Sequence, residues 1–290
     1  MHVKLGLGSY LFRWAIGTPS FRPARPLNAF GLLEKARELG VGLVQFADNL
    51  PLHRLSDDEL KALKKKADAY GIELENGMEG VTAERLLEYL RISRLIGARL
   101  LRVSFHAPDI HPTLEEGLQA IKDVLPQFAE AGVSIAIENH FTISSPDLVR
   151  LVEKANSPFV GICLDVANSI RQKEWPEETV AMLAPYALSL HLKDYRLETH
   201  PDQLGVYIAG APLGEGLLDA GEVLKTLSIY RTGFSVILEQ WCPPADTEEE
   251  TLRRETEWIR KGLNHARSVL LRFMETTVHT GSGGTKHAAI

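Results

Sequence analysis

Four short apolar segments in the second half of the chain each carry, near their end, a side chain that can bind a metal ion or transfer a proton. The segments are SIAIENH (134–140), GICLDVANS (161–169), LSLHLKD (188–194) and FSVILEQW (234–241). Side chains alternate along a strand, so each segment has one branched apolar face and one face of small and polar residues. The polar faces carry Glu138, Asp165, His191 and Glu239. Three carboxylates that meet in a buried space repel one another, and a divalent cation supplies the counter-charge that they need.

The residue types indicate which metal ion this group would take. Carboxylates with one imidazole suit Mg²⁺ or Mn²⁺, with Zn²⁺ and Co²⁺ as alternatives, and they leave coordination positions open for a substrate with two neighbouring oxygens. A simpler interpretation is that each polar residue pairs with a nearby lysine or arginine. The metal site is favoured because four consecutive segments share the same alternation and the same polar end.

These four segments belong to a longer alternation of strand-like and helix-like stretches. The strand candidates are residues 4–9, 41–47, 71–76, 99–105, 133–139, 160–166, 187–193 and 234–240. Helix signals lie between them. Ser56 and Glu59 form a capping-box pattern, and Gly71 ends the helix that they open. Ser145 with Pro146 opens a later helix.

Strands that alternate with helices predict a parallel sheet, and eight right-handed units close into a barrel. We therefore predict an α/β protein with a single (β/α)8 TIM barrel over residues 1–275, with a doubly wound sheet as the alternative. Residues 276–290 are rich in Gly and Thr and predict a flexible C-terminal tail. In a barrel the polar faces point inward, and the four candidate ligands then lie at the C-terminal ends of the strands, where barrel active sites are found.

The composition of the chain indicates which classes of binding partner to expect. The chain has 290 residues, 44% of them hydrophobic and 24% charged, with a net charge of -6. This charge gives no general attraction to nucleic acids or anionic membranes, and no segment approaches the roughly 18 apolar residues of a membrane span. Two cysteines are too few for a disulfide framework. We expect a cytoplasmic protein with a small-molecule substrate, and the sequence leaves a homo-oligomer open.

The four segments also resemble a known superfamily. IENH, LDVAN, HLKD and LEQ are similar to the metal-binding pattern of the xylose isomerase-like barrels, which include sugar isomerases, epimerases and lyases. The resemblance implies that Glu138, Asp165, His191 and Glu239 bind one divalent metal ion. It also implies that Glu138 and Glu239 form the catalytic acid/base pair. LGLGSYLFRWAIG, VQFADNLPLHRL and GIELENGMEG resemble more closely the branch of 3-oxo-isoapionate decarboxylases.

The segment RLLRVSFHAPD contributes two candidate substrate contacts by the same alternation. Arg102 and His106 fall on its inward face, where they would bind the carboxylate or hydroxyls of a substrate. The alternative for Arg102 is that it neutralises Glu73 or Glu75 on the preceding strand.

Three further residues are candidates for the same pocket. Lys193 lies two residues past His191 on the same face and would hold a substrate carboxylate, or else pair with Glu239. Trp14 is a candidate wall of the pocket. Asn168 would contact the substrate or orient a ligand carboxylate.

These candidates predict a metal-dependent enzyme acting on an oxo sugar acid or a keto sugar. The predicted function is a carbon–carbon lyase that decarboxylates a 3-oxo sugar acid through a metal-stabilised enediolate in carbohydrate catabolism. A keto-sugar isomerase or epimerase with the same metal and Glu pair is the alternative. A DNA-repair phosphodiesterase is disfavoured by the acidic charge, and a non-catalytic sugar-binding barrel would not require two carboxylates on opposite sides of one metal.

Overall fold

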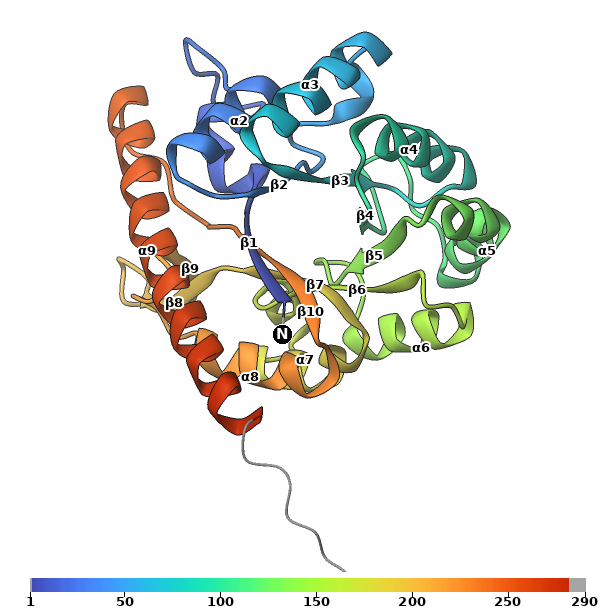
Figure 1. The fold of residues 1–290 in the computed structure, drawn as a ribbon. Coiled ribbons are helices and arrows are strands. Elements are labelled where there is room, and N and C mark those ends of the chain that lie inside the picture. Colours follow the sequence, from blue (N-terminus) through green and yellow to red (C-terminus); the bar gives the residue numbers. More distant parts are fainter. Residues whose placement is uncertain (1, 282–290) are drawn as a thin grey trace, which may run out of the picture.

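The computed structural model describes residues 2–281, with side-chain surroundings for residues 3–275, and shows a closed parallel barrel (Figure 1). The barrel strands are β1 (His2–Gly8), β2 (Leu43–Gln45), β3 (Glu73–Glu79), β4 (Leu100–Ser104), β5 (Ser134–Glu138), β6 (Val160–Asp165), β7 (Ala187–Leu192) and β10 (Gly233–Leu238). They pair in the order β1-β10-β7-β6-β5-β4-β3-β2, and β2 pairs with β1 to close the ring. The predicted TIM barrel is confirmed, and the doubly wound alternative is wrong because the sheet has no open edge.

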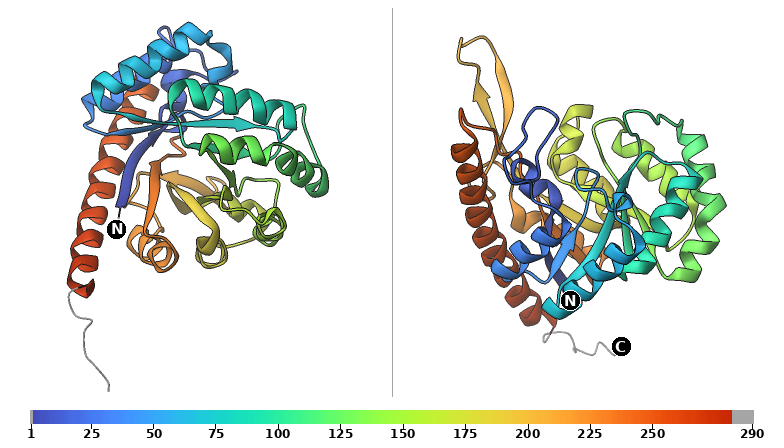
Figure 2. Two further views of the ribbon diagram at one scale, coloured as in Figure 1. Left: turned by 45° about the vertical axis from the view of Figure 1, so that its right-hand side comes forward. Right: turned by 90° about the horizontal axis from the view of Figure 1, so that it is seen from above.

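Helices surround the barrel. They are α1 (Arg13–Ile16), α2 (Ala29–Glu38), α3 (Asp57–Tyr70), α4 (Ala83–Ile96), α5 (Leu114–Ala131), α6 (Ser145–Ala155), α7 (Pro176–Leu183), α8 (Ala220–Tyr230) and α9 (Glu248–Gly281). Short 3₁₀ turns span Ser9–Phe12, Leu52–Arg54, Asn168–Gln172 and Ala184–Tyr186. Helix α9 runs along the outside of the barrel past α8 (Figures 1 and 2). None of the helices within residues 2–281 is both long and apolar enough to cross a bilayer.

Local signals in the sequence set several helix ends. Ser56 Oγ accepts the backbone N–H of Glu59, and the Glu59 carboxylate accepts that of Ser56, as the capping-box pattern predicts. Gly71 follows α3 with a φ of 65°, a conformation that favours glycine. The cap of α6 differs by one residue from the prediction, because Ser144 rather than Ser145 accepts the N–H of Asp147.

Because side chains alternate along each strand, one face packs in the core between strands and helices and the other lines the inside of the barrel. Branched residues such as Ile135 and Ile137 on β5 are fully buried and belong to the hydrophobic core between strands and helices. The opposite faces point into the barrel, where β1 contributes Gly6 and Gly8 towards its C-terminal end. A side chain at Gly6 would clash with Ile237 and Leu43, so the barrel interior is already filled at this point.

An antiparallel hairpin of β8 (Asp194–Thr199) and β9 (Val206–Ala211) interrupts the barrel pattern between β7 and α8. Figure 2 shows it projecting beyond the barrel beside α9. This hairpin was not predicted from the sequence.

At the C-terminal end, α9 continues to Gly281, past residue 275 where the predicted barrel ends, so the predicted tail overlaps the end of this helix. Residues 282–290 of that tail lie outside the described residues. The division into barrel and tail stays a prediction.

Candidate metal centre and active site

The four predicted ligands come from neighbouring strands. Glu138 is the last residue of β5, Asp165 the last of β6, His191 lies near the end of β7, and Glu239 directly follows β10. These strands are adjacent in the barrel, and Asp165 and His191 are partners in the register of β6 and β7. All four side chains therefore meet inside the C-terminal end of the barrel.

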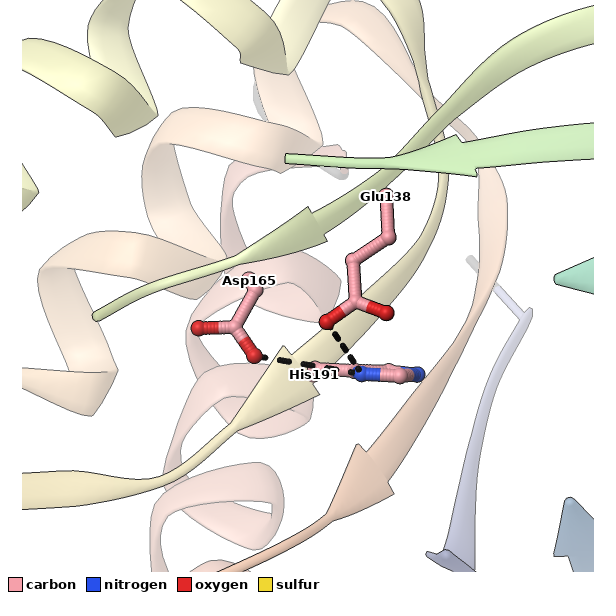
Figure 3. Close-up of side chains that lie close together, drawn as sticks. All are labelled: Glu138, Asp165 and His191. Carbon is pink, nitrogen blue, oxygen red and sulfur yellow. Dashed lines mark ion pairs between the residues drawn. The ribbon is translucent and has the colours of Figure 1, made fainter. Parts of the chain in front are cut away.

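The ligand atoms lie close enough to share an ion. One atom each from Glu138, Asp165 and His191 lies within 4.8 Å of the others. Figure 3 shows the three side chains pointing towards one another. His191 Nδ1 is 3.6 Å from Glu138 Oε1 and 3.9 Å from Asp165 Oδ2. Glu239 is not part of this group of three, although its Oε1 lies 3.3 Å from His191 Nδ1. A divalent ion about 2.0–2.6 Å from each atom fits such a spacing.

The hydrogen bonds around these ligands leave His191 Nδ1 and Asp165 Oδ2 facing the other ligands. His191 Nδ1 is buried and has no hydrogen-bond partner among the described residues, while Nε2 lies 2.7 Å from Gln45 Oε1. Asp165 Oδ1 accepts the backbone N–H groups of Ala167 and Asn168, which directs Oδ2 at the other ligands. A buried imidazole nitrogen that faces carboxylates without a hydrogen bond is what a metal-binding histidine requires.

Two buried cations pair with the same carboxylates. Arg102 contacts Glu138 through Nε and Nη2, and its Nη1 lies 2.7 Å from Asp48 Oδ1. The ion pairing that the sequence offered as the alternative to a metal is therefore present for Glu138.

Lys193 makes the second set of pairs. Its Nζ lies 2.6 Å from Asp165 Oδ2 and 2.8 Å from Glu239 Oε2. Together the two cations face four carboxylates, which leaves two negative charges when His191 is neutral. A divalent cation would balance this excess, so ion pairing and a metal site are compatible.

The pKa directions follow from these contacts. Burial opposes the charge of Glu138, but Arg102 and His191 outweigh it and hold the pKa of Glu138 well below its usual range. Burial raises the pKa of Asp165, because Lys193 only partly offsets the desolvation and the nearby acids. Burial also opposes the charge of Lys193, yet Asp165 and Glu239 raise the pKa of its ammonium.

The other predicted site residues are placed differently. Asn168 Nδ2 donates to Glu138 Oε1 at 2.8 Å, so it contacts a predicted ligand. His106 lies in the loop after β4, where Nδ1 is 2.7 Å from Thr142 Oγ1 and Nε2 is 3.1 Å from the carbonyl of Pro112. Among the described residues, its recorded hydrogen bonds are to these groups and not to the four predicted ligands.

Trp241 is an aromatic residue beside the site. Lys193 Nζ lies 5.3 Å from the centroid of its ring, a cation–π distance. Trp14 lies in α1, and its indole N–H donates to the carbonyl of Cys242, the residue after Trp241. Trp14 therefore contacts the residue that follows Trp241, and it is Trp241 that faces Lys193.

Three polar residues near the site were not predicted. Asp48, in the loop after β2, lies between Arg102 and Tyr10, whose hydroxyl donates to Asp48 Oδ2 at 2.5 Å. Gln45, the last residue of β2, contacts His191. A search for polar residues at the end of β2, extended to this very short strand, would have found Gln45 and Asp48.

Arg102 does not pair with Glu73 or Glu75, the alternative raised from the sequence. Glu73 pairs with Lys4 near the surface at 2.5 Å, and Glu75 accepts a hydrogen bond from Gln45. Arg102 instead points along β4 towards the C-terminal end of the barrel, where Glu138 and Asp48 lie.

Comparison with known proteins shows to which family the chain is related. The family model described as "Xylose isomerase-like TIM barrel" matches residues 33–262. The 3-oxo-isoapionate decarboxylase of Pectobacterium atrosepticum is 32% identical over 263 residues, which cover 91% of this chain and 94% of that enzyme. The family match and this relative confirm the prediction of an enzyme.

Solved structures agree on the fold. D-psicose 3-epimerase in the presence of D-fructose has a TM-score of 0.67 and 15% identity, covering 92% of this chain and 97% of the epimerase. A xylose isomerase-like TIM barrel protein from Mycobacterium smegmatis in complex with magnesium has a TM-score of 0.63 and 15% identity, covering 90% of this chain and 97% of that protein. With a family model that matches most of its length and a decarboxylase relative along nearly all of it, the chain belongs to the xylose isomerase-like TIM barrel family.

Proposed function

We propose that the protein is a divalent-metal-dependent carboxy-lyase that removes CO₂ from a 3-oxo sugar acid resembling 3-oxo-isoapionate. The observation that carries this proposal is the 32% identity to a 3-oxo-isoapionate decarboxylase along 91% of the chain. The site supports it, because Glu138, Asp165 and His191 form a buried donor set that suits Mg²⁺ or Mn²⁺.

We propose that Glu138, Asp165, His191 and Glu239 hold the cation. When bound there, a divalent cation polarises a substrate carbonyl and stabilises the negative charge that develops on its oxygen. The residues around it exclude water, since all four side chains are nearly or fully buried.

Lys193 is the proposed contact for the carboxylate that departs. Its ammonium is buried beside Asp165 and Glu239 and faces the ring of Trp241. Arg102 is likewise paired, with Glu138 and Asp48, so either cation would have to exchange a carboxylate of the protein for that of the substrate. A single ammonium suits decarboxylation better than a two-point arginine clamp, which would stabilise the charged ground state and oppose its conversion to neutral CO₂.

Glu138 and Glu239 are the proposed acid/base pair, with different freedom to act. Both oxygens of Glu138 accept hydrogen bonds, Oε1 from Asn168 and Oε2 from Arg102. Glu239 is paired with Lys193 through Oε2 alone, and its Oε1 faces His191. Because fewer donors hold it, we propose that Glu239 takes up a proton that comes ultimately from solvent and delivers it to the carbon that loses CO₂.

A keto-sugar isomerase or epimerase is the second candidate. It is favoured by the position of Glu138 and Glu239, whose carboxylates both face His191, and by the similarity in fold to D-psicose 3-epimerase. Two carboxylates around one site would remove a proton and return it.

The two candidates are separated by one experiment in D₂O. The Mg²⁺- or Mn²⁺-loaded enzyme is mixed with a panel of unphosphorylated 3-oxo sugar acids and simple ketoses, and CO₂ release is recorded together with deuterium in the product by NMR. The lyase should release CO₂ and leave deuterium on the carbon that carried the carboxylate. Conversion of a ketose to its epimer or aldose, with no CO₂ from any acid, would replace the lyase with the isomerase.

The Glu239→Gln variant tests the proton donor in the same assay. The amide still offers an oxygen but cannot transfer a proton, so metal binding should weaken moderately while turnover falls by about 100-fold or more. Glu257→Gln, an exposed exchange on α9, is the matched control and should retain full turnover. Retained turnover in Glu239→Gln would overturn the role of Glu239.

A further inference from the structure

A buried chain of hydrogen bonds crosses the barrel interior to reach His191. Gln45 Nε2 donates to Glu75 Oε2 at 2.8 Å, and Gln45 Oε1 lies 2.7 Å from His191 Nε2. Gln45 and Glu75 are partners in the register of β2 and β3, whereas His191 is on β7. Gln45 and His191 are fully buried, and Glu75 is 8% exposed.

Burial raises the pKa of Glu75, and above that pKa, where Glu75 is ionised, the chain has a fixed direction. A carboxylate only accepts hydrogen bonds, so the amide NH₂ of Gln45 must face Glu75. The amide oxygen then faces His191, and because this oxygen can only accept, His191 Nε2 must carry the hydrogen. In a neutral imidazole the other nitrogen, Nδ1, is left with a lone pair. This is the nitrogen that faces Glu138, Asp165 and Glu239 without a hydrogen bond.

We propose that Glu75 and Gln45 are positioning residues that hold His191 in the tautomer with the proton on Nε2, so that Nδ1 is available as the metal ligand. The inference rests on the proposed metal centre. It assigns to Glu75, which lies two hydrogen bonds away from His191, control over which nitrogen of His191 can bind a cation.

A purely space-filling role does not account for Glu75. A buried carboxylate is costly unless it is paired, and Glu75 makes no ion pair within the described part of the chain. An apolar residue at this position would fill the same volume without that cost. The reverse chain, with a protonated Glu75 and the amide turned round, would place a hydrogen on Nδ1 and aim it at the metal centre.

The tautomer can be read directly in the metal-free protein. Long-range ¹H–¹⁵N NMR of ¹⁵N-histidine-labelled protein distinguishes the two tautomers, and the signals lost in a His191→Gln variant assign the ring. The expected result for the unmodified protein, at a pH at which Glu75 is ionised and the His191 ring is neutral, is a proton on Nε2 alone. A neutral ring with its proton on Nδ1 would overturn the proposal.

Two variants test the chain. Glu75→Gln replaces an obligate acceptor with a group that donates or accepts, so His191 should show a mixture of tautomers. Gln45→Leu removes the acceptor for Nε2 and should have the same effect. Mn²⁺ affinity, measured by calorimetry, should fall about 10- to 100-fold in each variant, the usual cost of losing a group that orients a metal-binding histidine.

Glu73→Gln is the matched control. Glu73 lies two residues earlier on the same strand, and its side chain pairs with Lys4 near the surface. This variant should keep both the tautomer and the Mn²⁺ affinity. Circular dichroism and thermal unfolding identify any variant that fails to fold, and the NMR result for the unmodified protein tests the proposal without a variant.

The readouts separate this inference from the proposed function. Neither the tautomer nor Mn²⁺ affinity requires a substrate. Absence of CO₂ release would therefore overturn the proposed lyase and leave the positioning role of Glu75 and Gln45 intact. An unchanged tautomer and an unchanged Mn²⁺ affinity in both Glu75→Gln and Gln45→Leu would overturn that role, whatever reaction the enzyme catalyses.

Discussion

A buried carboxylate on α9 should make the stability of the protein fall as pH rises. Glu255 is 2% exposed, and its carboxylate accepts the backbone N–H groups of Trp14 at 2.6 Å and Ala15 at 3.0 Å. Burial raises the pKa of Glu255 from 4.5 to about 7, and the two N–H groups offset only part of that effect. The informative change is Glu255→Gln, which keeps the size of the side chain and removes its titration.

The direction in which stability changes with pH follows from proton binding by the folded and unfolded chains. Between 4.5, the ordinary pKa, and about 7, the pKa of Glu255 in the fold, the folded protein holds a proton that the unfolded chain has lost. The free energy of unfolding therefore falls as pH rises through this window, and the stabilising contribution is complete only below the lower value. The difference between the two pKa values corresponds to about 3 kcal/mol. The carboxylate is buried, so solvent does not screen this contribution.

The assay is urea denaturation of the chelator-treated protein at pH 4.5 and pH 8, followed by circular dichroism. Glu255→Gln loses one acceptor for a backbone N–H at both pH values, which gives a constant offset. Relative to the unmodified protein, the variant should gain about 3 kcal/mol of stability between pH 4.5 and pH 8. Glu257→Gln, exposed on the same helix, is the control and should show no comparable gain. If the two variants behave alike, Glu255 does not titrate differently in the folded and unfolded chains, and the reasoning is refuted.

Three further outcomes are expected. Arg102→Met leaves the carboxylates of Glu138 and Asp48 without their shared cation, and should lower the free energy of unfolding by about 3–5 kcal/mol in urea denaturation; a loss below 1 kcal/mol would contradict the buried pairing. Gly210→Ala places a Cβ 2.1 Å from the carbonyl oxygen of Trp241, and should cost about 1–3 kcal/mol and change the tryptophan fluorescence; an unchanged thermal midpoint and spectrum would show that the hairpin base is not packed there. Removal of divalent cations with a chelator should abolish turnover, and Mn²⁺ at about 100 times its Kd should restore it with about 2.7 kcal/mol of added stability; full turnover after chelation would rule out a metal requirement.

The barrel could be predicted from the sequence because buried strands carry a strong pattern. All eight predicted strands overlap barrel strands, since the apolar faces must meet helices and the polar faces must meet one another. The hairpin β8–β9 could not be found in the same way. It lies in a loop between β7 and α8, where the barrel sets no requirement for burial, and several of its apolar side chains are exposed.

The candidate ligands followed from alternation, but their partners did not. The parity of each strand places Glu138 and Arg102 inside the barrel, yet which carboxylate Arg102 meets depends on the tilt and register of neighbouring strands. The sequence offered Glu73 and Glu75, and the structure pairs Arg102 with Glu138 and Asp48. Loop residues are harder still, because strand alternation does not extend to His106, whose ring turns to Thr142 and Pro112.

The order of the strands also bears on how the chain is completed during synthesis. β1 pairs with β10, and Glu239, the last predicted ligand, directly follows β10. One late segment therefore both closes the ring and completes the acidic cluster. A nascent chain that ends before this segment leaves the N-terminal strand without one of its two neighbours and its buried acids open to water. Folding of this barrel must consequently wait for long-range contacts between the two ends of the chain, and an unfinished chain cannot assemble the full set of predicted ligands.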